Sequence, residues 1–565
     1  MDSGDLIAEM LVGYGVKYVF GIPGGQTLPL YNAIARRPEH IQHILIRDER
    51  SGPYAADAYA RVARRLAVCD AVPGPGVVKL PSGLAEAYVS SVPLVAIAGD
   101  VATQWQPLTR YACAAQGLDQ LNLLRPVCKS VIPVKSQSLL PGAVRQAFKE
   151  ATTGRPGPTV LDIPDDVFHA DWDPAVLPAA VEPSFGFFPA ARVRPAAAAV
   201  EAAAKALLSA RRPVMAVGGG GLLSGATREV QALAEALNMP VVTSVTGKGT
   251  ISEEHPLCAG VLGGQYGEES ANAVVREADV VLMVGFKSSQ QSTFSWNLPT
   301  ADQKVIHLDI DPYEIGKVFT TEIALVGDAT AGLQDLLQQV LSASPTPPVR
   351  RDWLSRLAEV KAQWQAEVEG EMQPRSPIRP QQLVAELQRQ MAPEDIMVTD
   401  ASFSIGWITS FYQARSAGRQ CLFPRGSATL GFGLPASIGA RLATPTEQRV
   451  VCLAGDGGFG YALGELATCR KYNLRVTVVV LNNAGLGYSR WGEKLGQGRY
   501  ENVEFPATDF AAIARGFGCT GLKVDAPDQV GDVLRQALDT DGPVVVDAAV
   551  DRWETPELVL RKKRS

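Results

Sequence analysis

The chain has 565 residues, 46% hydrophobic and 20% charged, an ordinary composition for a globular protein of three or four domains. The formal net charge is −6, with both signs interspersed, so we expect no basic face for a nucleic acid. The N-terminus lacks a signal-peptide pattern and no apolar run reaches about 18 residues, so no membrane span is expected. These features predict a cytoplasmic protein whose eight scattered cysteines stay reduced.

Short β-branched runs alternate with helical patterns along the whole chain. Examples are "YVFGIP" near the N-terminus, "PVMAVGGGG" in the middle and "RVVCLAGDG" towards the C-terminus. The runs are continuously apolar rather than alternating, which is typical of parallel strands buried on both faces. The helical patterns between them predict βαβ units and doubly wound sheets.

Two proline-rich stretches, near residues 175–199 and 341–353, read as linkers. They predict an N-terminal α/β domain over 1–175, a central domain over 190–342, a C-terminal domain over 375–550 and a short basic tail over 551–565. Each predicted domain has a suitable length for one α/β sheet.

In the central segment, the glycines Gly218–Gly221 follow a strand pattern. Glycines there let backbone N–H groups approach a phosphate, although such a run is not specific by itself. The segment lacks the G-x-G-x-x-G pattern, and no acidic residue is convincingly placed after its strand. Both points argue against a dinucleotide-dependent oxidoreductase.

In the last third, one strand pattern ends in Gly455-Asp456-Gly457 and the next ends in Asn482-Asn483. Ligands bind at the carboxyl ends of parallel strands, so Asp456 and Asn483 would lie side by side. A carboxylate and an amide oxygen, with the backbone of Gly485, suit a Mg²⁺ ion that also binds a diphosphate. Glycines lack a side chain, so they let backbone N–H groups come close to that diphosphate. The glycines expected to do so are Gly455, Gly457 and Gly458.

Separately, each motif is also a common turn signal. Together they resemble the signature of the thiamine diphosphate (ThDP) enzymes. The segments "VFGIPGGQTLPLYNAI", "GKGTISEEHPLCAGVLGG" and "GSATLGFGLPASIGARLA" resemble the acetohydroxyacid synthase-like branch, which includes acetolactate synthases, oxalyl-CoA decarboxylases and 2-hydroxyacyl-CoA lyases. The resemblance covers nearly the whole chain.

The resemblance implies three flavodoxin-like α/β domains, which bind the ThDP pyrimidine, a nucleotide and the ThDP diphosphate in that order. It implies ThDP and Mg²⁺ as cofactors. Members of the family pair the pyrimidine domain of one subunit with the diphosphate domain of another. We therefore expect a homodimer or homotetramer with active sites at subunit interfaces.

The resemblance also implies roles for single residues. Glu49 matches the glutamate that hydrogen-bonds the cofactor pyrimidine, although its segment alone is equally compatible with a solvated acid at a helix start. Gln116 matches the glutamine of the family's Phe-Gln pair, whose phenylalanine is replaced here by Ala115. Leu430 matches the apolar residue that supports the bent cofactor. The Ala428 carbonyl would accept a hydrogen bond from the 4′-amino group. The other positions implied to contact the cofactor are Pro23, Gly24, Gly74, Asp400, Ala401, Ser402, Gly455, Gly457, Gly458, Asn483, Leu486 and Gly487.

Some residues depart from the acetolactate synthase pattern. Lys79 replaces a customary Asn, and "DASFSIGWITS" lacks a customary His. The segment "LGYSRWGEKLGQG" instead resembles the acyl-CoA lyase group, with Glu493 as a catalytic acid or base; the alternative is a surface acid paired with Lys494 or Arg490. The basic residues 561–564 could contact CoA phosphates or form a solvated tail.

The interpretation that follows is a ThDP- and Mg²⁺-dependent carbon–carbon lyase/ligase of the 2-hydroxyacyl-CoA lyase type. It would cleave a 2-hydroxyacyl-CoA to formyl-CoA and an aldehyde or ketone, or run the reverse condensation. The central domain would then hold the ADP moiety of ADP or CoA rather than FAD. The alternative is an acetolactate synthase-like carboligase or decarboxylase acting on 2-oxo acids, and a remote alternative is a non-catalytic binding or regulatory homologue.

Overall fold

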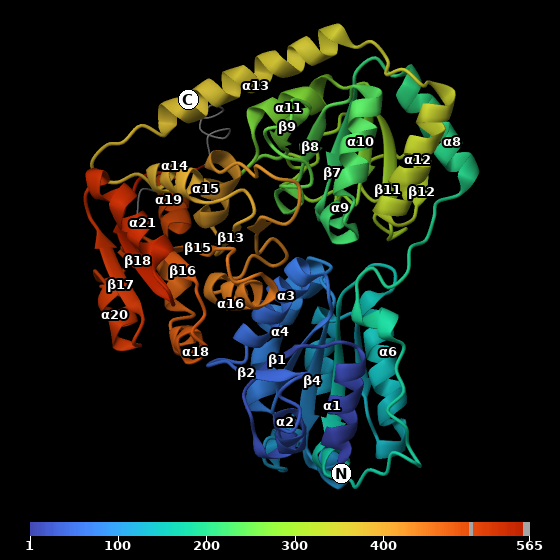
Figure 1. Cartoon of the computed structure of the whole chain (residues 1–565), viewed down its shortest axis with the longest axis vertical. Coiled ribbons are helices and arrows are strands. Elements are labelled where there is room, and N and C mark those ends of the chain that lie inside the picture. The colour runs from blue at the N-terminus through green and yellow to red at the C-terminus, as the bar shows by residue number, and fades with distance from the viewer. Residues whose placement is uncertain (497–500, 557–565) are drawn as a thin grey trace.

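The computed structural model describes residues 1–496 and 501–556, except for the side chains of residues 493–496 and 501. Figure 1 shows three sheets with their covering helices, one in each third of the chain. Each sheet has six strands, and all paired strands in the described chain are parallel. The predicted α/β class with three doubly wound parallel sheets is therefore confirmed.

The first sheet has the strand order β2-β1-β3-β4-β6-β5. The order reverses between β1 and β3, so a crevice is expected beyond the carboxyl ends of these two strands. The strands are β1 (Tyr18–Gly21), β2 (Gln42–Leu45), β3 (Ala67–Ala71), β4 (Leu94–Asp100), β5 (Ser130–Pro133) and β6 (Pro158–Pro164). The helices are α1 (Ser3–Gly13), α2 (Leu28–Ala35), α3 (Ser51–Ala63), α4 (Pro75–Val89), α5 (Gln120–Leu124), α6 (Leu140–Thr152) and α7 (Asp165–Phe168).

The central sheet has the order β12-β11-β10-β7-β8-β9. This is the order of dinucleotide-binding sheets, and it differs from that of the other two sheets; its switch point lies between β7 and β10. The strands are β7 (Pro213–Val217), β8 (Val241–Thr243), β9 (Cys258–Val261), β10 (Val280–Val284), β11 (Lys304–Asp309) and β12 (Ile323–Val326). The helices are α8 (Ala197–Ser209), α9 (Gly219–Ser224), α10 (Thr227–Leu237), α11 (Glu269–Glu277) and α12 (Ala329–Ala343), and the long α13 (Arg351–Glu371) leads to the last domain.

The third sheet, β14-β13-β15-β16-β18-β17, repeats the order of the first. Its switch point lies between β13 and β15, so the loops after these strands face one crevice. The strands are β13 (Ile396–Thr399), β14 (Cys421–Leu422), β15 (Val450–Gly455), β16 (Thr477–Asn482), β17 (Thr520–Val524) and β18 (Val544–Ala549). The helices are α14 (Pro380–Gln390), α15 (Phe403–Phe411), α16 (Gly433–Ala443), α17 (Asp456–Gly460), α18 (Glu465–Lys471), α19 (Gly487–Gly496), α20 (Phe510–Gly516) and α21 (Val530–Asp539).

The first and third domains pack closely through α3 and α16 (Figure 1). A Cβ atom at Gly439 of α16 would collide with the carbonyl oxygen of Ala55 in α3, so glycine permits this close approach. Tyr54 of α3 joins an apolar cluster with Phe432, and its hydroxyl donates to Thr429 Oγ1 at 2.8 Å. The first domain is thereby tied to the loop that precedes α16.

Each sheet lies within one of the three predicted domain ranges, while the domain limits themselves stay predictions. In the described part of the chain, no helix combines the length and apolar character needed to cross a membrane. All eight cysteines are free thiols, and only Cys113 is exposed.

Candidate active site

A cavity of about 350 Å³ opens at the carboxyl edge of the third sheet. Four separate loops contribute to its wall, and they follow β13, β14, β15 and β16. Many residues that the sequence singled out line it: Ala401, Ser402, Ala428, Leu430, Gly455, Asp456, Gly457, Gly458, Asn483, Gly485, Leu486 and Gly487. The fold thus gathers into one place residues that are distant in the sequence; their contacts with a ligand stay predictions.

Asp456 and Asn483 form the polar edge of this cavity. The Asp456 carboxylate is 5% exposed and accepts hydrogen bonds from the N–H groups of Gly457 at 2.9 Å and Gly485 at 3.0 Å. Burial raises the pKa of Asp456, and these hydrogen bonds oppose the rise. The Asn483 Oδ1 atom is buried and has no hydrogen-bond partner among the described residues. A buried, unpaired amide oxygen is costly, and a cation would satisfy it.

The Asp456 carboxylate and the Asn483 Oδ1 atom are oxygen ligands that suit a hard divalent cation. The described residues contain no group of three or more His, Cys, Asp or Glu side chains placed to hold a metal. One carboxylate and one amide oxygen would therefore leave positions for other oxygens, which is the pattern of Mg²⁺ bound together with a phosphate group. Around Gly455 a Cβ atom would meet nothing within 4 Å, so the wall is open there.

Asp400 does not line this cavity. Its carboxylate is 1% exposed and accepts hydrogen bonds from the N–H groups of Ala401 at 2.9 Å, Gly431 at 3.1 Å and Gly433 at 2.8 Å. Burial raises the pKa of Asp400 to about 6. Asp400 thus joins the loop after β13 to the loop before α16, while its neighbours Ala401 and Ser402 face the cavity.

The loop that carries Ala428 is fixed by a glutamate from the first domain. Ala428 has a φ of 56°, a left-handed conformation that is unusual for alanine. The fully buried carboxylate of Glu86, in α4, accepts hydrogen bonds from the N–H groups of Gly426 at 2.7 Å, Ser427 at 2.8 Å and Ala428 at 3.2 Å. This contact could not be predicted from the sequence, because it joins two domains.

The second group of predicted residues lies at the carboxyl edge of the first sheet. Glu49 is 7% exposed, just before α3, and its Oε2 atom lies 2.8 Å from the ammonium of Lys79. Gly74 has a φ of 68°, and a Cβ atom there would lie 2.7 Å from the carbonyl oxygen of Gln116. The Gln116 side chain accepts a hydrogen bond from Gln26 at 2.8 Å.

Pro23 and Gly24 belong to the loop after β1 at the same edge. A Cβ atom at Gly24 would collide with the side chain of Val72, just beyond β3. The close approach of these two loops explains the glycine. None of the described residues between 1 and 175 lines the cavity of the third sheet, so this group and the Asp456 group do not meet within one chain.

Glu493 lies in α19, but its side chain is outside the described residues. The basic residues 561–564 also lie outside them. Residues 551–556 of the predicted tail are described, and Glu554 accepts hydrogen bonds from Arg375 at 2.7 Å and Arg379 at 2.9 Å. The beginning of the tail therefore packs on the start of the C-terminal domain.

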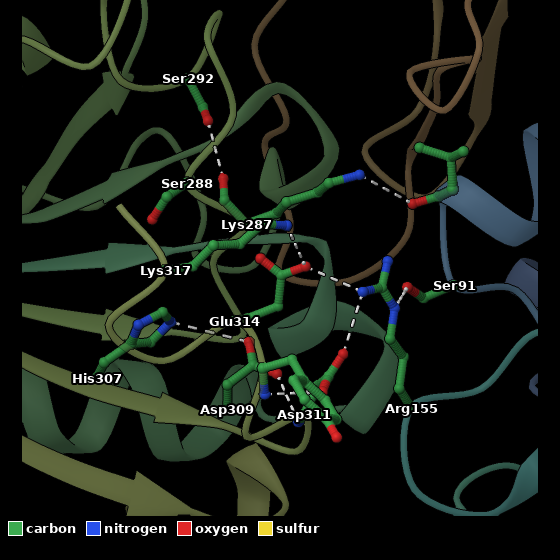
Figure 2. A network of polar contacts seen from close by, with 12 residues as sticks. Ser91, Arg155, Lys287, Ser288, Ser292, His307, Asp309, Asp311, Glu314 and Lys317 are labelled. Atoms are coloured by element: carbon green, nitrogen blue, oxygen red, sulfur yellow. Dashed lines mark hydrogen bonds and ion pairs between the residues drawn. The ribbon is translucent and has the colours of Figure 1, made fainter. Parts of the chain in front are cut away.

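A second cavity, of about 400 Å³, lies at the switch point of the central sheet. Gly219, Gly220 and Gly285 line it where β7 and β10 end. Figure 2 shows its charged side: Arg155, from the first domain, lies 3.2 Å from Asp311 and 3.0 Å from Glu314. Ion pairs across the domain boundary thus close this side of the cavity.

Asp309 lies at the end of β11 in the same cavity. Burial raises its pKa to about 6. Its neighbour His307 is also buried, and burial lowers the histidine pKa to about 4; Figure 2 shows the two side chains facing each other, 3.9 Å apart. Asp309 therefore places a buried carboxylate at the end of β11, across the switch point from β7.

The two cavities share part of their walls. Gln291, Arg425 and Ala428 line both. The sequence patterns did not assign Arg425 or Gln291 to the site, although Arg425 directly precedes the segment "GSATLGFGLPASIGARLA". Only the packing of the central domain against the third could show that these side chains face the cavity.

Three family models cover most of the chain. Residues 1–123 match "Thiamine pyrophosphate enzyme, N-terminal TPP binding domain", residues 200–336 match the central domain of the same enzymes, and residues 400–548 match their C-terminal TPP binding domain. The fold and the paired loops of the third sheet thus belong to an enzyme that uses thiamine diphosphate.

Curated relatives agree with this class. The chain is 34% identical to a probable acetolactate synthase large subunit of Methanocaldococcus jannaschii, over 99% of this chain and 93% of the relative. It is 32% identical to the acetolactate synthase isozyme 3 large subunit of Escherichia coli, over 98% and 96%. The chain therefore belongs to the acetohydroxyacid synthase-like family of ThDP enzymes.

Proposed function

We propose that the protein is a ThDP- and Mg²⁺-dependent carboligase or decarboxylase that acts on 2-oxo acids. The observation that carries this proposal is the buried Asp456 carboxylate beside the unpartnered Oδ1 atom of Asn483. That pair fits the divalent cation of a bound diphosphate. The relatives named as acetolactate synthases support 2-oxo acids as substrates.

The comparisons favour this alternative over the 2-hydroxyacyl-CoA lyase. The lyase interpretation depended mainly on Glu493 and on the basic residues 561–564. The structure describes neither the Glu493 side chain nor that part of the tail, and the relatives named above are acetolactate synthases.

Each part of the cavity would then have a defined task. Bound ThDP would supply a carbon nucleophile that protein side chains cannot provide. Asp456 and Asn483 would hold Mg²⁺, and backbone N–H groups near Gly457 and Gly458 would face the diphosphate. Leu430 would support the bend of the cofactor, and the Ala428 carbonyl, fixed through Glu86, would accept a hydrogen bond from the 4′-amino group.

We propose that Glu49 completes the site from a second subunit. Its carboxylate would hold a proton at the pyrimidine nitrogen N1′, with Gln116 nearby. Within one chain, residues 1–175 contribute nothing described to the Asp456 cavity. A homodimer, alone or within a tetramer, would bring the two groups together.

The central cavity is proposed to hold the ADP part of a nucleotide. Its place at the switch point of a dinucleotide-type sheet and its glycines support this proposal. Calorimetric titration with ADP, CoA and FAD would test it. Binding of ADP with no binding of FAD is expected, and binding of none of the three would refute it.

The main proposal is tested with purified protein, ThDP, Mg²⁺ and a panel of 2-oxo acids that includes pyruvate and 2-oxobutyrate. Release of CO₂ and formation of a 2-hydroxy-2-acyl acid product such as acetolactate are expected. A parallel reaction supplies formyl-CoA with an aldehyde. Formation of a 2-hydroxyacyl-CoA without turnover of any 2-oxo acid would restore the lyase interpretation.

A further inference from the structure

Arg425 is the one cationic side chain among the described residues that line the Asp456 cavity. It follows β14 in the loop that Glu86 fixes, three positions before Ala428. The guanidinium lies over the ring of Tyr266, with 5.6 Å between its central carbon and the ring centroid. The central domain therefore supports this side chain from one side, while the third domain carries its backbone.

Among the described residues, the guanidinium of Arg425 has no acidic partner. Within the described residues it makes no ion pair and no side-chain hydrogen bond; its backbone N–H donates to the carbonyl of Phe423 at 3.1 Å. The nearby acid, Glu86, uses its carboxylate oxygens for the N–H groups of residues 426–428 and for the hydroxyl of Ser90 at 2.9 Å. Burial lowers the pKa of Arg425, yet arginine stays charged in proteins.

Other acids of the cavity wall are occupied. Glu554 is paired with Arg375 and Arg379, and Asp551 accepts a hydrogen bond from the N–H of Trp553 at 2.9 Å. Asp456 accepts two backbone N–H groups. A partly buried guanidinium that lines a cavity and has no acidic partner among the described residues gains most from an anionic ligand. The planar guanidinium can bind a carboxylate through two hydrogen bonds.

We infer that Arg425 binds the carboxylate of the 2-oxo acid substrate and thereby selects it over neutral carbonyl compounds. This inference rests on the proposed function. The diphosphate is assigned to the edge formed by Asp456 and Asn483, whereas Arg425 precedes Ala428, whose carbonyl is assigned to the pyrimidine. The substrate would lie between the reacting end of the cofactor and the wall formed by Arg425, Tyr266 and Gln291.

The test compares wild type, R425Q and R425K. Losing the charge-assisted hydrogen bonds should raise KM for pyruvate by about 10- to 100-fold in R425Q, with a smaller change in kcat. The KM of R425K should lie between those of wild type and R425Q, since lysine keeps the positive charge but not the planar pair of hydrogen-bond donors. ThDP retention should be unchanged in both variants. R475Q is the matched control, because Arg475 lies at the amino end of β16 and donates to the carbonyl of Leu538.

A binding measurement separates this inference from the proposed function. Titration of the ThDP-loaded protein with a panel of 2-oxo acids, and with butanone as a neutral ketone, gives affinities that do not require turnover. Binding of a 2-oxo acid without turnover, weakened in R425Q, would refute the function but support Arg425. Turnover with an unchanged KM in R425Q, or loss of ThDP in place of substrate affinity, would overturn the inference. If the wild type neither binds nor turns over any 2-oxo acid, both the proposed function and the inference about Arg425 are overturned.

Discussion

The ammonium of Lys79 lies 2.8 Å from the carboxylate of Glu49, the residue assigned to the cofactor pyrimidine. The two residues come from different segments, Glu49 from the loop before α3 and Lys79 from the first turns of α4. Glu49 is 7% exposed, so its charge is held beside a cation within the first domain before any partner subunit is added. The customary Asn at position 79 would give no such ion pair.

K79Q should destabilise the protein by about 0.5–1 kcal/mol, since the lysine is half exposed and its ion pair is partly screened. The hydrogen bond with Glu49 raises the pKa of Lys79. This stabilisation is therefore complete at neutral pH, below the ordinary lysine pKa of about 10.4, and is lost as pH rises through the higher folded value. A double-mutant cycle with E49Q, followed by urea denaturation, should show coupling at pH 7. Equal effects of K79Q in both backgrounds would contradict the pairing.

E49Q should slow exchange of the cofactor C2 proton with deuterated solvent by about 10²- to 10⁴-fold, the usual contribution of a positioned acid or base. ThDP and Mg²⁺ should still bind, because Asp456 and Asn483 are unchanged. NMR of quenched samples measures the exchange. The adjacent D48N is the control: Asp48 pairs with Arg50 at 3.1 Å, and exchange should stay within a few-fold of wild type. Equal slowing in D48N would argue against a specific role for Glu49.

E86A should lower both stability and turnover. It leaves the N–H groups of Gly426, Ser427 and Ala428 without their buried acceptor, at a cost of about 2–4 kcal/mol. The loop that carries Ala428 and Arg425 would then lose its fixed position, so kcat should fall about 10-fold or more while the first domain stays folded. S90A, which removes one further hydrogen bond to Glu86, should have a much smaller effect. Unchanged kcat in folded E86A would show that the loop does not need this support.

Mixing E49A and D456A subunits tests whether each site uses two chains. Each variant alone should be inactive. If Glu49 and Asp456 act from different subunits, half of the sites in each mixed dimer are intact, and a random mixture of dimers should regain about a quarter of wild-type activity. Activity is measured after unfolding and refolding the mixed chains. No recovery, despite mixed dimers seen by native mass spectrometry, would place both residues in one chain's site.

The sequence predicted the parallel sheets well because both faces of each strand are buried, which leaves continuous apolar runs such as "VVVL" in β16. It also placed Asp456 and Asn483 at one edge, because strands of a parallel sheet end together. It showed Lys79 only as a departure from the family pattern, and it could not predict the contacts that Glu86, Lys79 and Arg425 make. Glu86 and Arg425 contact other domains, Lys79 contacts a distant loop of its own domain, and no spacing within the chain encodes such contacts.

The proposal that Asp456 and Asn483 coordinate the Mg²⁺ ion of the bound diphosphate is most directly tested by ThDP binding. ThDP binding to wild type, D456A, N483A and N482A should be measured by calorimetry with and without Mg²⁺. Asn482 is the control, because its amide already donates to Asp547 at 2.9 Å. We expect Mg²⁺-dependent binding in wild type and N482A, and its loss in D456A and N483A. Equal, Mg²⁺-independent binding in all four proteins would contradict the account.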